Sequence, residues 1–190
     1  MLARGRALRL VCCCLALLAL QAVGGVVPAQ AATHPTREST VKAAFLYRFG
    51  GFVEWPPGTF AHPNDPVVIG VAGDDQVASD LEEIVLGRTL AGRPLQVVRV
   101  RNTQAVESVN ILFLGSTRSG RTRDLVPAAK APVLVVSEKE DATRLGAALF
   151  FEPEGGRVRF SAAPSAAEAR GLRLSARLLA VAQSVEGHAR

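Results

Sequence analysis

The residue types that most often carry chemistry are few and scattered in this sequence. It has three histidines, His34, His62 and His188, and none has a second histidine or a carboxylate at the spacing of metal ligands. A catalytic triad needs a histidine held by the scaffold, and only His62, before Pro63 in a polar loop, is a candidate. A solvated loop histidine is the simpler interpretation. We predict no zinc site, no cofactor and no catalytic constellation.

One pair of carboxylates lies where doubly wound proteins bind ligands. Gly73-Asp74-Asp75 follows an apolar run expected to form the first strand. Paired carboxylates at this place hold magnesium in phospho-receiver domains, but such a domain needs a third aspartate after its central strand. Gly115-Ser116 stands there instead. We therefore favour a turn and helix cap at Asp74 over a magnesium site.

A basic segment is the second candidate. Arg118, Arg121 and Arg123 lie near an expected helix start, where backbone N–H groups and guanidinium groups together can bind a phosphate or a carboxylate. The segment lacks the Gly-Lys-Ser/Thr ending of a phosphate-binding loop and the serine of a nucleophile elbow. Anion binding and a solvated basic loop both remain open.

Aromatic and arginine side chains suggest contacts rather than catalysis. Phe45, Phe49 and Phe52 recur at helical spacing and are expected in the core. Trp55, at the end of that helix, is either a core residue or an interface anchor, since tryptophan is enriched at binding hot spots. We nominate for partner binding the Trp55 corner and the segment containing Leu172, Arg173, Leu174 and Arg177.

Apolar residues at helical spacing predict the helices, and short unbroken apolar runs predict the strands, that position these residues. Helices are expected at 41–54, 77–85, 122–130 and 165–185, where Gly171 marks a kink or a break. Arg170, Arg173 and Arg177 would share one face of the last helix. Strands are expected at 67–72, 95–100, 109–114, 133–136, 147–152 and 157–160, the last two as a hairpin around Gly155-Gly156. Strands separated by helices predict a three-layer α/β fold, with a mostly parallel sheet and an antiparallel C-terminal hairpin.

The first 31 residues have the three parts of a secretory signal. Arg4, Arg6 and Arg9 precede an uncharged apolar run, and Ala29-Gln30-Ala31 is a small-x-small cleavage site. An uncleaved N-terminal anchor is the alternative. Cleavage after Ala31 would remove three arginines and no acid, lowering the net charge from +5 to +2, which argues against nucleic acid as a partner. All three cysteines lie in this leader, so the mature chain would have no disulfide.

The full sequence has 48% hydrophobic and 21% charged residues, as is usual for a globular protein. The part after the leader suits one domain at 41–186, which follows a short polar tether at 32–40. A leader and no later apolar span predict export to the periplasm.

Several segments, in order, resemble the YfiR-like family of exported bacterial proteins. They are Val41–Phe49 with Phe52–Pro56, Val68–Asp74, Gly92-Arg93-Pro94, Asn110–Leu114, Pro132–Ser137, Gly155–Phe160 and Gly171–Leu179. Each segment alone is weak, but their order and spacing make the match specific.

The resemblance implies a periplasmic regulator rather than an enzyme. Well-known members bind the periplasmic part of a membrane diguanylate cyclase and hold it inactive, and an outer-membrane lipoprotein can sequester them. Biofilm formation through cyclic-di-GMP would be the output. Members commonly have a cysteine before the middle strand, where this chain has Val109, so redox control does not transfer.

Three functions remain open at this stage. The first is control of a membrane cyclase or sensor kinase by protein contact, and the second is a small-molecule or anion sensor using residues 116–123. The third is a hydrolase using Asp74 or His62. A homodimer is also left open.

Overall fold

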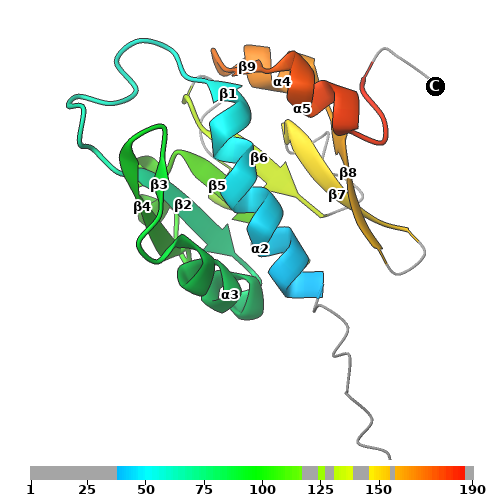
Figure 1. Ribbon diagram of the computed structural model, residues 1–190, viewed down its shortest axis with the longest axis horizontal. Coiled ribbons are helices and arrows are strands. Elements are labelled where there is room, and N and C mark those ends of the chain that lie inside the picture. Colours follow the sequence, from blue (N-terminus) through cyan, green and yellow to red (C-terminus); the bar gives the residue numbers. More distant parts are fainter. Residues whose placement is uncertain (1–37, 117–123, 127–130, 139–145, 155–156, 187–190) are drawn as a thin grey trace, which may run out of the picture. The chain divides into compact units, whose positions relative to one another are not determined.

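The computed structural model describes residues 38–116, 124–126, 131–138, 146–154 and 157–186 (Figure 1). The predicted leader with its cleavage site, most of the polar tether, Arg118, Arg121, Arg123, His34 and His188 lie outside these ranges, as does most of the helix predicted at 122–130. Within the described residues, no helix has the length and apolar character that crossing a membrane requires.

Seven strands form the main sheet, in the order β3-β4-β2-β5-β6-β7-β8. The five central strands are parallel, whereas β3 pairs antiparallel with β4 and β8 antiparallel with β7. The predicted α/β fold with a mostly parallel sheet and a closing hairpin is confirmed. The seven strands of this sheet are β2, Val67–Ala72; β3, Thr89–Leu90; β4, Arg93–Arg99; β5, Ile111–Leu114; β6, Leu134–Ser137; β7, Leu149–Glu154; and β8, Arg157–Ala162.

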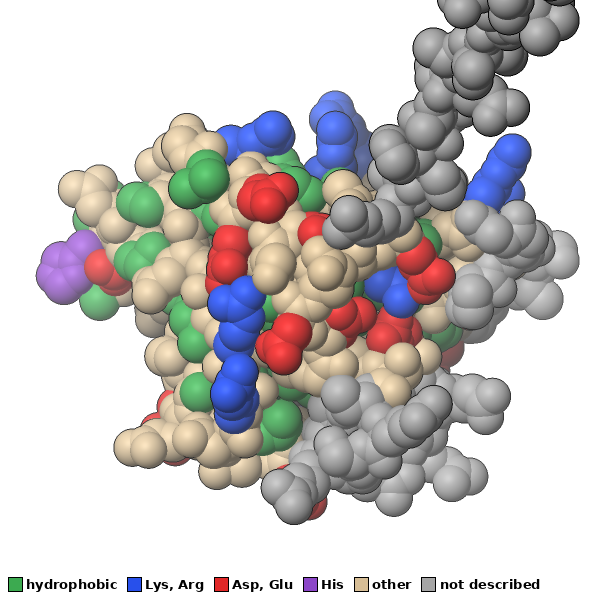
Figure 2. Space-filling model, turned by 90° about the horizontal axis from the view of Figure 1, so that it is seen from below, with side chains coloured by type: hydrophobic (Ala, Val, Ile, Leu, Met, Phe, Trp, Pro, Cys, Tyr) green, Lys and Arg blue, Asp and Glu red, His purple; other side chains and the backbone are tan. Residues whose placement is uncertain are grey.

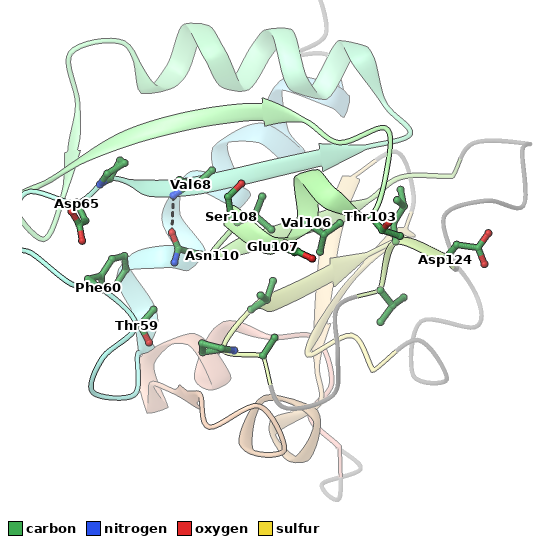
Figure 3. A pocket seen from close by; sticks show the side chains of 17 residues that line it. Thr59, Phe60, Asp65, Val68, Thr103, Val106, Glu107, Ser108, Asn110 and Asp124 are labelled. Atoms are coloured by element: carbon green, nitrogen blue, oxygen red, sulfur yellow. Dashed lines mark hydrogen bonds between the residues drawn. The ribbon is translucent and has the colours of Figure 1, made fainter.

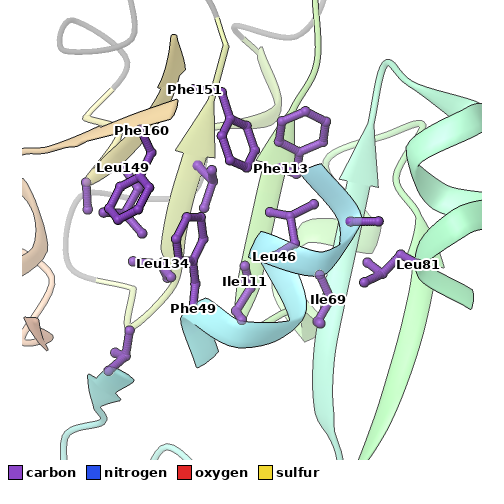
Figure 4. Close-up of a cluster of buried hydrophobic side chains, with 14 of the residues drawn as sticks. Leu46, Phe49, Ile69, Leu81, Ile111, Phe113, Leu134, Leu149, Phe151 and Phe160 are labelled. Atoms are coloured by element: carbon purple, nitrogen blue, oxygen red, sulfur yellow. The ribbon is translucent and has the colours of Figure 1, made fainter. Parts of the chain in front are cut away.

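Two helices cover one face of the sheet. The α2 helix, Glu38–Phe49, packs beside α3, Asp75–Val85, and Figure 4 shows the side chains of Leu46 and Phe49 directed at the strands. Phe49 is 1% exposed and its ring lies 5.0 Å from that of Phe160. Phe45 and Phe52 are partly buried and pack against the same core, so the predicted place of the three phenylalanines is confirmed, although Phe52 lies beyond the end of α2.

The opposite face has a smaller core. Val100, Leu112, Leu114 and Val135 are buried there. Among the described residues, its cover is the 3₁₀ helix η3, Gln104–Ser108, with the short stretches at 124–126 and 131. Strands buried on both faces explain the unbroken apolar runs in the sequence.

The first helix differs from its prediction at both ends. It starts at Glu38, inside the predicted tether, and ends at Phe49, followed by the 3₁₀ helix η2, Gly50–Phe52, and the strand β1, Val53–Glu54. Ser39 and Thr40, in the first turn, donate hydrogen bonds to Asp80 on α3, at 2.7 and 2.8 Å. A Cβ at Gly50 would lie 2.5 Å from the Leu90 side chain, so the backbone approaches β3 more closely there than a larger residue would allow.

Of the two alternatives predicted at Gly171, a kink or a break in the helix at 165–185, the structure has the break, and a strand follows it where a helix was predicted, which was wrong. The segment is divided into α4, Pro164–Glu168, the strand β9, Arg173–Leu174, and α5, Ala176–Val181. Gly171 has a φ of +72°, a left-handed conformation that ends the first piece. The predicted arginine stripe is therefore also wrong: Arg170 is only 5% exposed, while Arg173 is on a strand.

Candidate functional site

Two segments nominated separately for partner binding lie side by side. Strands β1 and β9 form a two-stranded antiparallel ladder, in which Val53 pairs with Leu174 and Glu54 pairs with Arg173. The Ser175 N–H also donates to the Phe52 carbonyl, at 2.9 Å. Because the ladder is antiparallel, Trp55, which directly follows β1, lies at the end of the ladder where Leu172 precedes β9, and the segment that follows β9 lies beside Phe52.

The burial of each side chain divides the nominated residues. Leu172 is fully buried in the core, so it is not on the surface. Trp55 and Leu174 are half-buried, whereas Arg173 and Arg177 are exposed. We give the name β1–β9 corner to the residues of this ladder, its ends and α5 that are not buried and are considered for partner binding, namely Trp55, Arg173, Leu174, Arg177 and Val181.

Val181 is the member of the corner that the sequence interpretation placed in the core. Its side chain is 70% exposed, which is unusual for a large hydrophobic residue in the described part of the chain. It lies four residues after Arg177 on α5, and residues at this spacing share a helix face. The exposure of Val181 could have been inferred from the possible break at Gly171, because a short separate helix has a different buried face from a continuous one.

Arg93 holds the loop that joins β1 to β2. Its Nη1 donates to the carbonyl oxygens of His62, Pro63 and Asp65, at 2.7, 2.9 and 3.2 Å. Its guanidinium group lies over the ring of Phe60, 4.1 Å from the centroid. Three carbonyl contacts and one cation–π contact from a single side chain fix this loop against the β3–β4 hairpin.

The same loop is ordered from within. Asp65 accepts a hydrogen bond from the His62 N–H, at 2.7 Å, and this bond lowers the pKa of Asp65. At the start of the loop, the Trp55 and Phe60 rings meet edge to face, with centroids 6.0 Å apart. The loop therefore connects the β1–β9 corner to the amino-terminal edge of the sheet through fixed contacts. His62 serves as a backbone partner in it.

The carboxyl ends of β2 and β5, where a ligand was considered, are filled by the protein itself. Asp74 Oδ1 accepts from the N–H groups of Gln76 and Val77, each at 3.0 Å, so it is the N-cap of α3. A Cβ on Gly115 would lie 3.1 Å from the Gly73 carbonyl. This close approach closes the space between β2 and β5, and the cap interpretation of Asp74 is confirmed. A small pocket of about 270 Å³ lies on the β4 side, between Asp74, Asp75 and Arg99.

Further along this edge, Lys42 of α2 is paired with two carboxylates. Its ammonium group contacts Glu138, whose side chain is 8% exposed, and Glu38, at 2.6 Å. Burial alone would lower the pKa of Lys42, but the hydrogen bonds to Glu138 and Glu38 outweigh it and raise the pKa. Glu138 also accepts from the Ser116 N–H, at 2.6 Å, so the contact joins α2 to the ends of β5 and β6.

Charged side chains of both signs are mixed on the face shown in Figure 2. Arg99, for example, bonds Glu82 at 2.6 Å and lies 3.7 Å from Asp75. Paired charges of this kind differ from the single-sign surface that binds a phosphate backbone. Among the described residues, no three His, Cys, Asp or Glu side chains gather to hold a metal ion.

A cavity of about 660 Å³ lies at the amino-terminal edge of the sheet, on the face away from α2 and α3 (Figure 3). Thr59, Phe60 and Asp65 of the Arg93-held loop form one wall. Residues of η3, the start of β6 and the stretch 124–126 form the rest. The candidate anion segment at 118–123 lies outside the described residues, and sequence reasoning did not identify this cavity, because its walls come from five separate segments.

Comparison with known proteins assigns the chain to a family. No curated protein matches it. Among solved structures, it is similar to a conserved domain protein from Vibrio cholerae O1 biovar El Tor strain N16961, with 14% identity and a TM-score of 0.47. That match covers 78% of this chain and 60% of the other, so this chain spans less than two thirds of that protein. A family model described as YfiR/HmsC-like matches residues 39–183, from the start of α2 to just beyond α5. The chain belongs to the YfiR/HmsC-like family.

Proposed function

We propose that this protein is a periplasmic regulatory binding protein that controls a membrane diguanylate cyclase by protein–protein contact. Membership of the YfiR/HmsC-like family supports the proposal, because the family is known for periplasmic repression of such a cyclase. A membrane sensor kinase is the alternative partner, and an outer-membrane lipoprotein is a candidate second partner. The proposal includes export and removal of the leader at residues 1–31.

Repression of this kind needs binding energy and no catalytic group. A regulator that binds the inactive state of its partner about 4 kcal/mol more tightly than the active state shifts their ratio about a thousandfold. The described residues therefore need to supply a surface, and the β1–β9 corner is the one we select.

The observation that carries this choice is the pairing of β1 with β9. It places Arg173 opposite Glu54, the residue before Trp55, although Arg173 and Trp55 are more than a hundred residues apart in the sequence. Tryptophan and arginine are the residues most enriched at binding hot spots. Exposed Val181 adds apolar area to the same surface.

The test is binding of variants to membranes that contain the partner. Trp55→Ala should weaken binding by about 30-fold, which is about 2 kcal/mol, and Arg173→Glu with Arg177→Glu should weaken it further. Leu86→Ala and Arg101→Glu are matched controls, because both residues are exposed and lie outside the corner. They should bind as the unchanged protein does.

Two results would contradict the proposal. One is wild-type binding by folded corner variants, which would exclude this surface. The other is crosslinked membranes that yield no cyclase or kinase with the wild-type protein, which would exclude the function.

A further inference from the structure

The cavity at the amino-terminal edge of the sheet has the features of a small-molecule site. Its volume of about 660 Å³ lies within the range of about 300–1,000 Å³ that is typical of ligand pockets. It is separate from the surface proposed for the signalling partner, so the inference below does not depend on the proposed function.

The floor of the cavity is apolar and belongs to the folded core. Val106, Val109 and Val133 contribute to it, and their residual exposures are 5%, 4% and 5%. These side chains pack on the sheet with Leu112 and Val135 beneath them. A ligand resting on this floor would replace water on an apolar surface, which favours binding.

Asn110 fixes the polar part of the floor. Its Oδ1 accepts from the Val68 N–H at 2.8 Å, its N–H donates to the Val68 carbonyl at 2.8 Å, and its carbonyl accepts from the Leu134 N–H at 2.8 Å. These bonds hold three neighbouring strands together at the cavity. In Figure 3 the amide nitrogen of Asn110 is on the side away from Val68, where it can donate to a ligand.

The wall formed by the loop is held in place before any ligand arrives. Arg93 binds the carbonyls of His62, Pro63 and Asp65 and covers Phe60, as described above. A wall that is already ordered loses little conformational entropy on binding. This separates the cavity from a surface groove that must form around its occupant.

The charged side chains among the described lining residues are all acidic, and Arg93, which holds the loop wall, is not among the lining residues. Asp65, Glu107 and Asp124 lie along the cavity, from the loop to the stretch 124–126, and its described lining residues include no lysine, arginine or histidine (Figure 3). Asp65 keeps its charge to low pH, because the His62 N–H lowers its pKa. A negative rim over an apolar floor complements a ligand that carries a positive charge on an apolar body.

We propose that this cavity binds a small organic cation, namely an apolar body that carries a protonated amine. The body would lie on Val106, Val109 and Val133, and the amine would face the rim carboxylates. The site assigns selectivity by charge: a neutral molecule of the same shape binds more weakly, and an anion is excluded.

The test compares three probes with the purified full-length chain. 2-Phenylethylamine, 2-phenylethanol and phenylacetate have the same ring and chain and differ in charge. Chemical shift perturbation of backbone amides should show the amine at Val106, Val109 and Asn110, with the alcohol binding about two- to fivefold more weakly and phenylacetate not binding.

Variants separate the charge from the shape of the site. Glu107→Gln and Asp124→Asn should each weaken the amine about two- to fivefold and leave the alcohol unchanged. Glu83→Gln, an exposed residue of α3 on the other face, is the matched control and should change neither. Ala131→Trp should fill the cavity and remove binding of both probes. If that variant fails to fold, the rim variants still decide.

Three outcomes would overturn the inference. The first is equal binding of the amine and the alcohol, and the second is tighter binding of phenylacetate. The third is no perturbation of the cavity residues by the amine at concentrations up to about 10 mM.

Discussion

At the scale of single residues, Arg93 connects the most features of the molecule. It follows a turn that is made by Ala91 and Gly92, whose φ angles are +50° and +80°. Arg93 itself begins β4, opposite Leu90. The turn therefore aims the Arg93 side chain at the loop between β1 and β2, and one guanidinium orders both the loop and a cavity wall.

Replacing Arg93 should loosen this loop more than it destabilises the fold. Arg93→Ala removes three hydrogen bonds from a charged donor and a cation–π contact, and should lower the free energy of unfolding by about 1–3 kcal/mol. The free energy of unfolding of Arg93→Lys should lie between those of Arg93→Ala and the unchanged protein, because an ammonium group keeps the charge but loses the planar guanidinium group. Trp55 is the only tryptophan, so its fluorescence reports on the loop directly.

The measurement is urea unfolding followed by Trp55 fluorescence and by far-UV circular dichroism. In Arg93→Ala the fluorescence change should precede the loss of secondary structure, whereas in the unchanged protein the two should coincide. Arg101→Ala, an exposed arginine just after β4, is the control. Coincident and unshifted transitions in Arg93→Ala would show that the clamp does not order the loop.

At the scale of elements, the sequence predicted the strands better than the ends of the helices. Val67–Ala72 is an unbroken apolar run between polar loops, and a run of this length is typical of a strand buried on both faces of a sheet. The C-terminal segment also shows a clear apolar period, but a period cannot show that Leu174 pairs with Val53 across a ladder. That pairing depends on residues far away in the sequence, and it overrides the local helical pattern.

The candidate site shows the same division. Trp55 and the segment after Gly171 were both nominated from residue type, which is a local property. Their contact, the exposure of Val181 and the burial of Leu172 follow from the ladder and from the break at Gly171. The cavity was not predictable for the same reason, since its walls come together only in the folded chain.

Substitutions at the break distinguish a divided C-terminal segment from a continuous helix. Gly171 has a φ of +72°, and Ser175 Oγ accepts from the Leu178 N–H as the N-cap of α5. Gly171→Ala should cost about 1–2 kcal/mol through backbone strain, and Ser175→Ala about 1 kcal/mol through loss of the cap. In a continuous helix both changes to alanine would instead stabilise the protein.

Thermal or urea unfolding of the two variants gives the sign of each effect. Glu83→Ala, at an exposed position within the regular helix α3, is the control and should have little or no effect. A gain in stability at Gly171→Ala would contradict the broken segment and, with it, the arrangement of the β1–β9 corner.

At the scale of the whole molecule, contacts between distant elements hold three parts of the chain in register. Asp80 joins α2 to α3, Lys42 joins α2 to the ends of β5 and β6, and the β1–β9 ladder joins the first helix to the last. Since the described core beneath α2 is one continuous cluster that includes Val53 and Leu172, it joins the β1–β9 ladder to the main sheet.

The pKa shifts of Asp65 and Lys42 predict how the stability changes with pH, at low pH for Asp65 and at high pH for Lys42. The pKa of Asp65 is lowered in the folded protein, so the stability from its His62 hydrogen bond is complete above the ordinary value of 3.8. It is lost as the pH falls through the folded value. The pKa of Lys42 is raised, so its contribution is complete below the ordinary value of 10.5 and is lost as the pH rises through the folded value.

Between these limits neither group should make the stability depend on pH. Asp65→Asn should flatten the acid limb of a plot of unfolding free energy against pH, with its difference from the unchanged protein shrinking as the pH falls below about 3.8. Lys42→Met should lower the stability at neutral pH, because Glu138 is left buried without its cation, and should flatten the alkaline limb. A constant difference for Asp65→Asn across the acid range would mean that the loop does not depend on the ionised carboxylate.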